Sequence, residues 1–383
     1  MQTETIALEG RTPTSAPVPL DRKERLKRFG EAMDRVRDQV EAKVGPEDIA
    51  HVRRVDRFSR AMEVVGRVLI HISVEPLSFS LGVGALWLHK QLQATEIGHT
   101  ALHGAYDKLE DNEGLQSKTF SWDIPIDEES WRYGHNIRHH QYTNIAGKDP
   151  DIHFGPARLT EHTPHAPHHR FQLPFMLALL APNFTLLMNL HFTGLSDFYF
   201  GNGRPEQLDI LPDRSWKSAK EAHRKAFRKW VPYYLKNYGL FPLLAGPFFW
   251  KVLLGNWMAE TLRDLYSAAT IYCGHVGHDV ASYDEGTRAH GRGEWYAMQV
   301  ESTNNFEVSL PVSILCGGLD RQIEHHLFPR LPPDRLREIA PEVRAVCEAH
   351  GVAYRTASWG STLKKALGHI QALGFRDFAR AMA

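Results

Sequence analysis

The spacing of hydrophobic positions predicts helices along most of the chain. Between residues 21 and 43, apolar side chains recur every three or four positions, the period of an amphipathic helix. We expect this helix to pack on the protein's own core; the alternative is that it lies on a membrane surface. Helical patterns also cover residues 333–347 and 361–373, whereas residues 1–20, rich in Thr, Pro and Ala, are expected to be disordered. The repeating positions of the first helix are Leu26, Phe29, Met33, Val36 and Val40.

Three longer stretches are more apolar than the rest of the chain. Residues 57–103 predict two helices with a break at Glu75-Pro76, and residues 171–195 form a second stretch. Residues 240–273 are the most hydrophobic and are expected to divide into two helices near Gly255-Asn256. None is an uninterrupted apolar span of 20 residues. Because a charge at the centre of a bilayer costs roughly 2.5–3.5 kcal/mol, the charged side chains here must face the bundle interior or an interface.

Composition narrows the class of protein. The 383 residues have a mean hydropathy of -0.37, so any membrane contact coexists with a large polar part. Lys+Arg and Asp+Glu both total 45, which gives no basic excess for binding nucleic acid. The three cysteines form no CxxC pair, so neither a zinc ribbon nor an iron–sulfur cluster is expected. The 22 histidines stand out, and imidazole is the commonest metal ligand in proteins.

Histidines gather in three short motifs beside the apolar stretches. The motifs are HxxxH at residues 99–103, HxxxHH at 135–140 and QxxHH at 322–326. On a helix, His99 and His103 point from one face. A fourth fragment places His275 and His278 at the end of the most hydrophobic stretch. Each motif alone is weak, but together and in this order they predict a metal centre.

These motifs and the gaps between them resemble the membrane fatty acid desaturase family, in particular its actinobacterial acyl-CoA (stearoyl-CoA type) branch. The resemblance runs from about residue 60 to 355. The segments that carry it are Glu96–Tyr106, Trp131–Asn144, Cys273–His275, Gly293–Tyr296 and Gln322–Pro329.

The resemblance implies an all-α integral membrane bundle of about four spans, with a cytosolic helical cap that holds a histidine-ligated di-iron site. Two non-haem iron ions would be the cofactors and O2 the co-substrate, and imidazole suits iron. Gln322 is expected to be a weak ligand or to orient one. The implied ligands are His99, His103, His135, His139, His140, His275, His325 and His326.

The function implied by the resemblance is O2-dependent introduction of a double bond into a long-chain fatty acyl substrate, with acyl-CoA as the expected carrier. The sequence has no flavin, nicotinamide or cytochrome b5 motif, so a separate reductase or ferredoxin is expected to supply electrons. Two alternatives stay open. One is a fatty acyl or alkane hydroxylase of the same superfamily, and the other is a non-catalytic membrane protein with a closed zinc site.

Membrane topology follows from the requirement that all motifs reach one metal centre. We expect an N-terminal segment 1–56, a membrane domain with its cap at 57–355 and a helical tail at 356–383. Four spans (58–74, 77–103, 240–254 and 256–273) leave every motif on the cytosolic side of the inner membrane, with 171–195 in the interface or under the cap. The alternative has one span at 171–195 and one long span at 240–273. The basic stretch Lys217–Lys229 favours the four-span arrangement, which keeps it inside.

Overall fold

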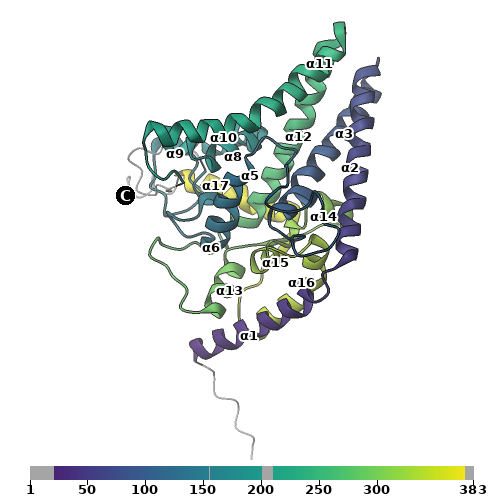
Figure 1. The fold of residues 1–383 in the computed structure, drawn as a ribbon. Coiled ribbons are helices and arrows are strands. Elements are labelled where there is room, and N and C mark those ends of the chain that lie inside the picture. The colour runs from purple at the N-terminus through teal and green to yellow at the C-terminus, as the bar shows by residue number, and fades with distance from the viewer. Residues whose placement is uncertain (1–20, 155, 201–209, 376–383) are drawn as a thin grey trace, which may run out of the picture.

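The structure, a computed structural model, describes residues 21–154, 156–200 and 210–375. The disorder expected for residues 1–20 therefore lies outside the described residues. The described chain is mostly helical, as predicted, with one two-stranded parallel sheet formed by β1 (Asn305–Glu307) and β2 (Thr356–Ser358). Figure 1 shows two long helical hairpins that project at one end of the molecule and a group of shorter helices at the other end.

The first hairpin consists of α2 (Pro46–Ile72) and α3 (Pro76–Leu92). The predicted break at Glu75-Pro76 is confirmed, because the carboxylate of Glu75 accepts two backbone N–H groups from the first turn of α3. The two helices approach closely at Gly66, where an added Cβ atom would lie 2.6 Å from the backbone nitrogen of Leu86. The lack of a side chain at Gly66 therefore allows the two helices of the hairpin to pack this closely.

The second hairpin differs from the prediction in its boundaries. Its descending arm, α12, is one continuous helix of 27 residues, so the predicted break near Gly255-Asn256 is wrong. Gly255 serves close packing, since an added Cβ would lie 2.9 Å from Cγ2 of Ile70 in the first hairpin. The amide of Asn256 donates to the backbone oxygen of Asn237. The turn of the hairpin comes earlier, between α11 and α12. The elements are α10 (Trp216–Tyr234), η7 (Leu235–Leu240), α11 (Phe241–Leu244), η8 (Gly246–Phe248) and α12 (Phe249–His275).

A kinked helical stretch lies beside the lower part of α12. Among the described residues, Pro167–Phe192 is the one helical stretch long and apolar enough to cross a membrane by length and composition. Pro174 and Pro182 lie within it and divide it into short α, 3₁₀ and π pieces. Its pieces are η4 (Pro167–Phe171), α7 (Gln172–Phe175), η5 (Met176–Leu180), η6 (Ala181–Asn183) and α8 (Phe184–Phe192), followed by α9 (Leu195–Phe200).

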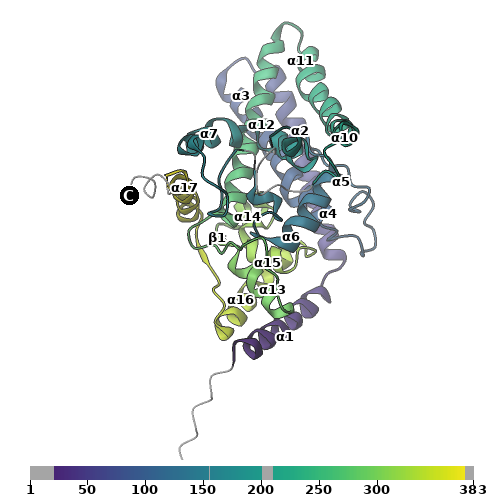
Figure 2. The same ribbon diagram turned by 90° about the vertical axis from the view of Figure 1, so that its left-hand side faces the viewer.

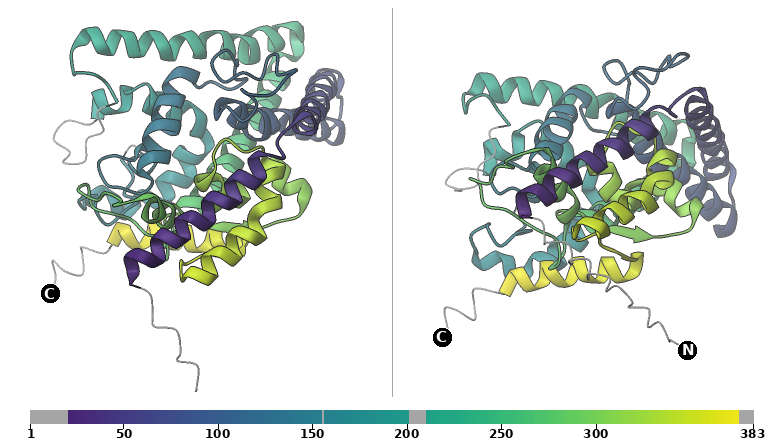
Figure 3. Two further views of the ribbon diagram at one scale, coloured as in Figure 1. Left: turned by 60° about the horizontal axis from the view of Figure 1, so that its bottom comes forward. Right: turned by 90° about the horizontal axis from the view of Figure 1, so that it is seen from below.

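The cap lies opposite the hairpin tips. The predicted N-terminal helix, α1 (Arg22–Glu41), packs on the protein's own core there, because Phe29, Met33 and Val36 are buried against α13 and α16. Figure 3 shows α1 and α16 side by side across this end. The cap helices are α13 (Arg292–Glu301), α14 (Leu310–Cys316), η9 (Leu319–Arg321), α15 (Gln322–Leu327) and α16 (Pro333–His350).

The C-terminal helix α17 (Trp359–Phe375) packs on α12 and α7 and closes one flank of the molecule. Figure 2 shows it beside the middle of α12, between the hairpin tips and the cap. The division of the chain at residues 56 and 355 stays a prediction.

Candidate metal centre

Two π-helical segments carry the first two histidine motifs. The segments are η1 (Gln93–His99), which continues into α4 (Thr100–Leu102), and η2 (Arg132–His139), which follows α5 (Glu128–Trp131) and continues into α6 (His140–Tyr142). A π-helix closes i to i+5 hydrogen bonds, so residues four and five positions apart share a face. This geometry explains how HxxxHH can present all three of its imidazoles in one direction. π-Helical turns occur often at functional sites.

The structure brings all eight predicted histidines into one buried cluster. Seven of them form two groups whose nitrogen atoms lie within 4.8 Å of one another in each group. His140 lies between the groups, with its ring centroid 4.3 Å from that of His326 and 4.8 Å from that of His103. The first group is His99, His103, His135 and His325, and the second is His139, His275 and His326.

The imidazole nitrogens in this cluster face one another at distances that suit shared metal ions. Nε2 of His99 lies 3.2 Å from Nε2 of His103, and Nε2 of His139 lies 3.3 Å from Nε2 of His326. Two nitrogens that each lie about 2.1 Å from one metal ion are separated by roughly this distance. Several buried nitrogens also have no hydrogen-bond partner among the described residues, a state that metal binding would relieve. They are Nε2 of His135, both ring nitrogens of His140, and Nε2 of His325.

Carboxylates contact two of these rings at their Nδ1 atoms. Nδ1 of His139 lies 2.8 Å from Asp149, and Nδ1 of His135 lies 3.2 Å from Asp151. Asp149 also accepts the backbone N–H of Asp151 and so caps the start of η3 (Pro150–Ile152). Each of the two carboxylates thus contacts a histidine of the cluster. Such partners fix the orientation of metal-binding imidazoles.

Polar side chains hold His326, a role that sequence reasoning missed. Nδ1 of His326 lies 3.1 Å from Oε1 of Gln299 and 3.1 Å from the hydroxyl of Thr143. The Thr143 hydroxyl in turn lies 2.8 Å from Gln299. Thr143 follows the second motif by three residues, whereas Gln299 comes from α13, and neither sits in a pattern that marks it.

Gln322 contacts His275. Its amide nitrogen lies 2.7 Å from Nε2 of His275, and its amide oxygen has no partner among the described residues. Both residues are buried. The packing is close, since a Cβ atom added at Gly274 would lie 2.8 Å from Cγ of Gln322. The geometry therefore places Gln322 where it orients His275 or contributes its oxygen to a metal.

Burial and neighbouring charges set the protonation of the cluster. Burial, and after it the nearby His326, lowers the pKa of His140 well below its usual value. Burial likewise lowers the pKa of His325 and of His326. These imidazoles are therefore neutral, the form that binds metal. For His139, burial lowers the pKa, but Asp149 and Asp151 outweigh it and raise the pKa to about 9.

An apolar cavity reaches the cluster from the side of the hairpins. His99, His135 and His275 line one part of it, together with Gln322. The remaining walls come mainly from η1, α5, α8, α12 and the segment before α5, and most of their side chains are apolar or aromatic. The apolar and aromatic side chains include Ala94, Trp122, Ile124, Trp131, Phe184, Met188, Phe192 and Ile271. The polar exceptions are Thr95, Asp151, Thr185, Ser267 and Thr270. An unbranched hydrocarbon chain is the kind of ligand that such a cavity suits.

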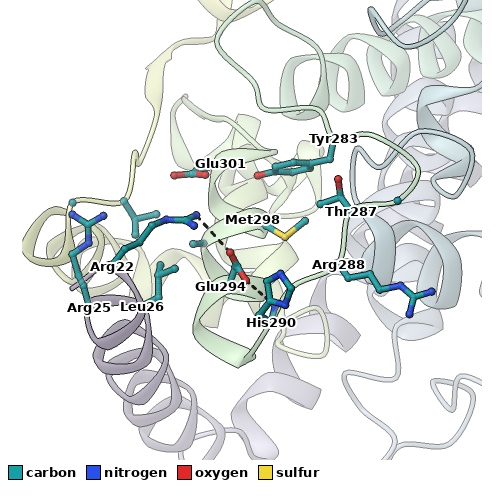
Figure 4. Close-up of a pocket in the computed structure, with 14 residues that line it drawn as sticks. Arg22, Arg25, Leu26, Tyr283, Thr287, Arg288, His290, Glu294, Met298 and Glu301 are labelled. Carbon is teal, nitrogen blue, oxygen red and sulfur yellow. Dashed lines mark hydrogen bonds and ion pairs between the residues drawn. The ribbon is translucent and has the colours of Figure 1, made fainter. Parts of the chain in front are cut away.

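A second, open cleft lies between α1, α13 and the segment before α13, and it is polar (Figure 4). Within it, Arg22 points toward Glu294, with 3.5 Å between their charged groups. None of the eight histidines lines this cleft. Helix α13 separates it from the metal centre, because Met298 lines the cleft while the next residue, Gln299, contacts His326.

Comparison with known proteins gives one consistent family. Residues 74–358 match the family model described as "Fatty acid desaturase". The chain is 32% identical to the "NADPH-dependent stearoyl-CoA 9-desaturase" of Mycobacterium tuberculosis, over 85% of this chain and 75% of that protein. It is 27% identical to the "sn-1 linoleoyl-lipid 6-desaturase" of Synechocystis, over 68% of this chain and 70% of that protein. It is 29% identical to the "Acyl-lipid (8-3)-desaturase" of Mortierella alpina, over 64% of this chain and 54% of that protein.

Proposed function

The chain belongs to the fatty acid desaturase family, a family of oxidoreductases, and we propose that it uses O2 to introduce a double bond into a long-chain fatty acyl substrate carried by CoA. The observation that carries the proposal is the convergence of eight buried histidines beside an apolar cavity. The acyl-CoA assignment is supported by the printed name of the Mycobacterium tuberculosis relative. The names of the other two relatives refer to acyl chains that are linked to lipids. Whether CoA or a lipid carries the acyl chain here is therefore to be measured directly.

We propose that the cluster holds two iron ions, one for each group of histidines, with His140 between them. The buried nitrogens of His135, His140 and His325 that have no hydrogen-bond partner among the described residues support this proposal, because a neutral imidazole nitrogen offers a lone pair that can bind a metal ion. When bound, iron supplies the redox chemistry that activates O2 for removal of hydrogen from an unactivated methylene. Asp149 and Asp151 hold the rings of His139 and His135 by their Nδ1 atoms, which turns Nε2 toward the metal.

The acyl tail is proposed to occupy the apolar cavity beside the cluster. Trp131 stacks on His135, with ring centroids 4.5 Å apart, and both side chains line the cavity. A methylene chain in this cavity therefore passes along the histidines, with water excluded by the aromatic walls. Because the cavity has a fixed shape, it holds a given pair of carbons next to the metal centre, which gives regioselectivity.

The arrangement of the hairpins supports the four-span topology. Both hairpins turn at the same end of the molecule, and the histidines follow their other ends, with His99 after α3 and His275 at the end of α12 (Figures 1 and 2). Membrane insertion of the hairpin ends would leave every histidine on one side, which we propose is the cytosolic side. Exposed apolar side chains cover these ends: Val64, Val68, Ile72, Leu77, Leu81, Leu243, Leu244, Trp250, Leu254 and Trp257. Exposed apolar surface of this extent supports a membrane contact at these ends.

One part of this topology differs in detail from the sequence-based boundaries. The third membrane segment is the upper part of the α10–α11 arm rather than residues 240–254, because the turn lies at 245–248. The apolar stretch Pro167–Phe192 is proposed to lie in the interface, since its proline-divided pieces pack along α12 and α17. Electrons are proposed to come from a separate reductase or ferredoxin.

Lipid analysis of cells that express the protein with a reductase tests the proposed function. Wild type is expected to convert saturated acyl chains to products lighter by two hydrogens, and His139→Ala is expected to abolish this conversion. His168→Ala serves as the matched control, because His168 is an exposed histidine outside the cluster. Products heavier by one oxygen would identify a hydroxylase, and unchanged lipids with wild type would contradict the proposal.

A further inference from the structure

Besides the apolar cavity, His275 lines another cavity, which is smaller and polar and is distinct from the cleft of Figure 4. It lies between the end of α12, the loop after it, the loop before η4, and α17. The apolar cavity and this polar cavity share one lining residue, His275. The cluster thus has an apolar side and a polar side. The polar side chains that line the second cavity are Asn144, Thr160, Glu161, His278, Ser282 and His369.

Buried polar atoms without partners gather at this cavity. Among the described residues, Oδ1 of Asn144 and Nδ1 of His275 have no hydrogen-bond partner, although both side chains are more than nine-tenths buried. Near Gly277, which also lines the cavity, both amide atoms of Asn304 and Oδ1 of Asp279 have none either. Buried groups of this kind are normally satisfied by ordered water, which needs a polar space with two to four partners. The cavity offers such a space.

The hydrogen-bond partners at Nδ1 of other histidines in the cluster support the presence of water in this cavity. His139, His135 and His326 each have a protein side chain at Nδ1. Nδ1 of His275 and Nδ1 of His140 have none among the described residues, and of these two histidines only His275 lines the polar cavity. An imidazole that binds metal through one nitrogen donates its other N–H to a carboxylate, a carbonyl or a water. For His275, water in the polar cavity is the acceptor that the structure provides.

The cavity also reaches solvent. His278, Ser282 and Glu161 are exposed, while His369 is half-buried. The charged groups that face His369 are His278 and Asp279, and Asp279 pairs with Lys365 of α17 at 2.5 Å. The cleft of Figure 4 begins one residue further along the chain, since Ser282 lines the cavity and Tyr283 lines the cleft.

We propose that this polar cavity is the water-filled route through which protons reach the metal centre and product water leaves it. The proposal rests on the proposed function. Desaturation breaks two C–H bonds and the O–O bond, and it forms the C=C double bond and two molecules of water. The substrate supplies two hydrogens, the external donor supplies two electrons, and two protons must come from solvent. The apolar cavity, filled by the acyl chain, cannot carry them.

A substitution that fills the polar cavity with a larger side chain tests the proposal. Val280 is a half-buried apolar residue in its wall, so Val280→Phe fills the space without removing a polar group. We expect about tenfold slower double-bond formation, a larger ratio of the rates in H2O and D2O, and release of part of the consumed O2 as hydrogen peroxide. Ile271→Phe, which fills the apolar cavity from the same helix as His275, is expected to change the preferred acyl length and leave the ratio unchanged.

Both variants are compared at wild-type iron content, which separates a blocked route from a lost site. Val280→Phe with wild-type iron, wild-type rate and an unchanged ratio of rates would overturn the route. A wild-type protein that forms no double bonds would contradict the proposed function instead. If Val280→Phe does not fold, His369→Leu replaces it, with His168→Leu as control. The route is supported if His369→Leu, but not His168→Leu, forms double bonds more slowly and has a larger ratio of the rates in H2O and D2O. Identical behaviour of the two variants overturns the route.

Discussion

Nδ1 of His139 lies 2.8 Å from Oδ1 of Asp149, and both side chains are fully buried. The bond fixes the ring so that Nε2 faces His326, 3.3 Å away. Asp149 is itself fixed by the backbone N–H groups of Asn144 and Asp151. The ring of His139 is therefore oriented by the loop that follows the second motif.

Asp149→Asn is expected to weaken this orientation while keeping the shape of the side chain. We predict a 10- to 100-fold loss of iron affinity or activity, the usual cost of removing such a partner. Iron content after dialysis against a chelator measures the effect. Asp284→Asn is the control, because Asp284 is exposed and pairs with His162 away from the cluster. Equal iron retention by the two variants would show that Asp149 does not support the site.

The apolar cavity predicts how the acyl length changes with its volume. Ala94 is buried on η1 and lines the cavity, so Ala94→Leu shortens the space available to the chain. We expect the products to shift toward shorter acyl chains, measured by gas chromatography of total lipids. Gly84→Leu on α3 is the control, because no atom lies within 4 Å of a Cβ added there. An unchanged product profile for Ala94→Leu would place the substrate elsewhere.

His51 predicts a pH dependence of stability. The imidazolium of His51 donates hydrogen bonds to the carboxylates of Asp334 and Glu96, which raises the pKa of His51 to about 9, although burial lowers it. Because the folded pKa lies above the unfolded value of 6.5, the stabilisation is complete below about pH 6.5 and is lost as pH rises through 9. It amounts to at most about 3 kcal/mol. Thermal unfolding of the solubilised protein at pH 6 and pH 10 measures it.

His51→Gln should flatten this pH dependence, with the difference in unfolding temperature between wild type and variant largest at pH 6. His350→Gln is a matched control, since His350 bonds a backbone carbonyl of its own helix, α16. An equal pH dependence in wild type and His51→Gln would refute the role of this ion pair.

A buried charged cluster in the hairpins predicts a large loss of stability on mutation. Arg263 is fully buried and pairs with Glu260 at 2.6 Å and with Asp264 at 2.8 Å. Arg263→Met leaves two buried carboxylates, and of these Glu260 alone keeps an ion-pair partner among the described residues, Lys90. We expect a loss of about 3–5 kcal/mol in the free energy of unfolding. Arg344→Met, which removes an exposed pair, is expected to cost less than 1 kcal/mol, roughly the value of a surface ion pair.

Sequence reasoning identified the helices and the histidines but not the surroundings that orient them. The break at Glu75 carried a local signal, a capping side chain before a proline. The break near Gly255 was wrong because glycine there serves packing against Ile70, a contact across two hairpins that no local pattern shows. Likewise, the motifs marked His326 but not Gln299, which meets it only after the chain folds.

The most direct test of the central claim is the metal content and electronic state of the purified protein. Cells grown on ⁵⁷Fe would supply protein for elemental analysis and Mössbauer spectroscopy in parallel. The account predicts two iron ions per chain, present as a magnetically coupled pair and lost together in His140→Ala. Zinc as the native metal, or a single isolated iron in fully active protein, would contradict it.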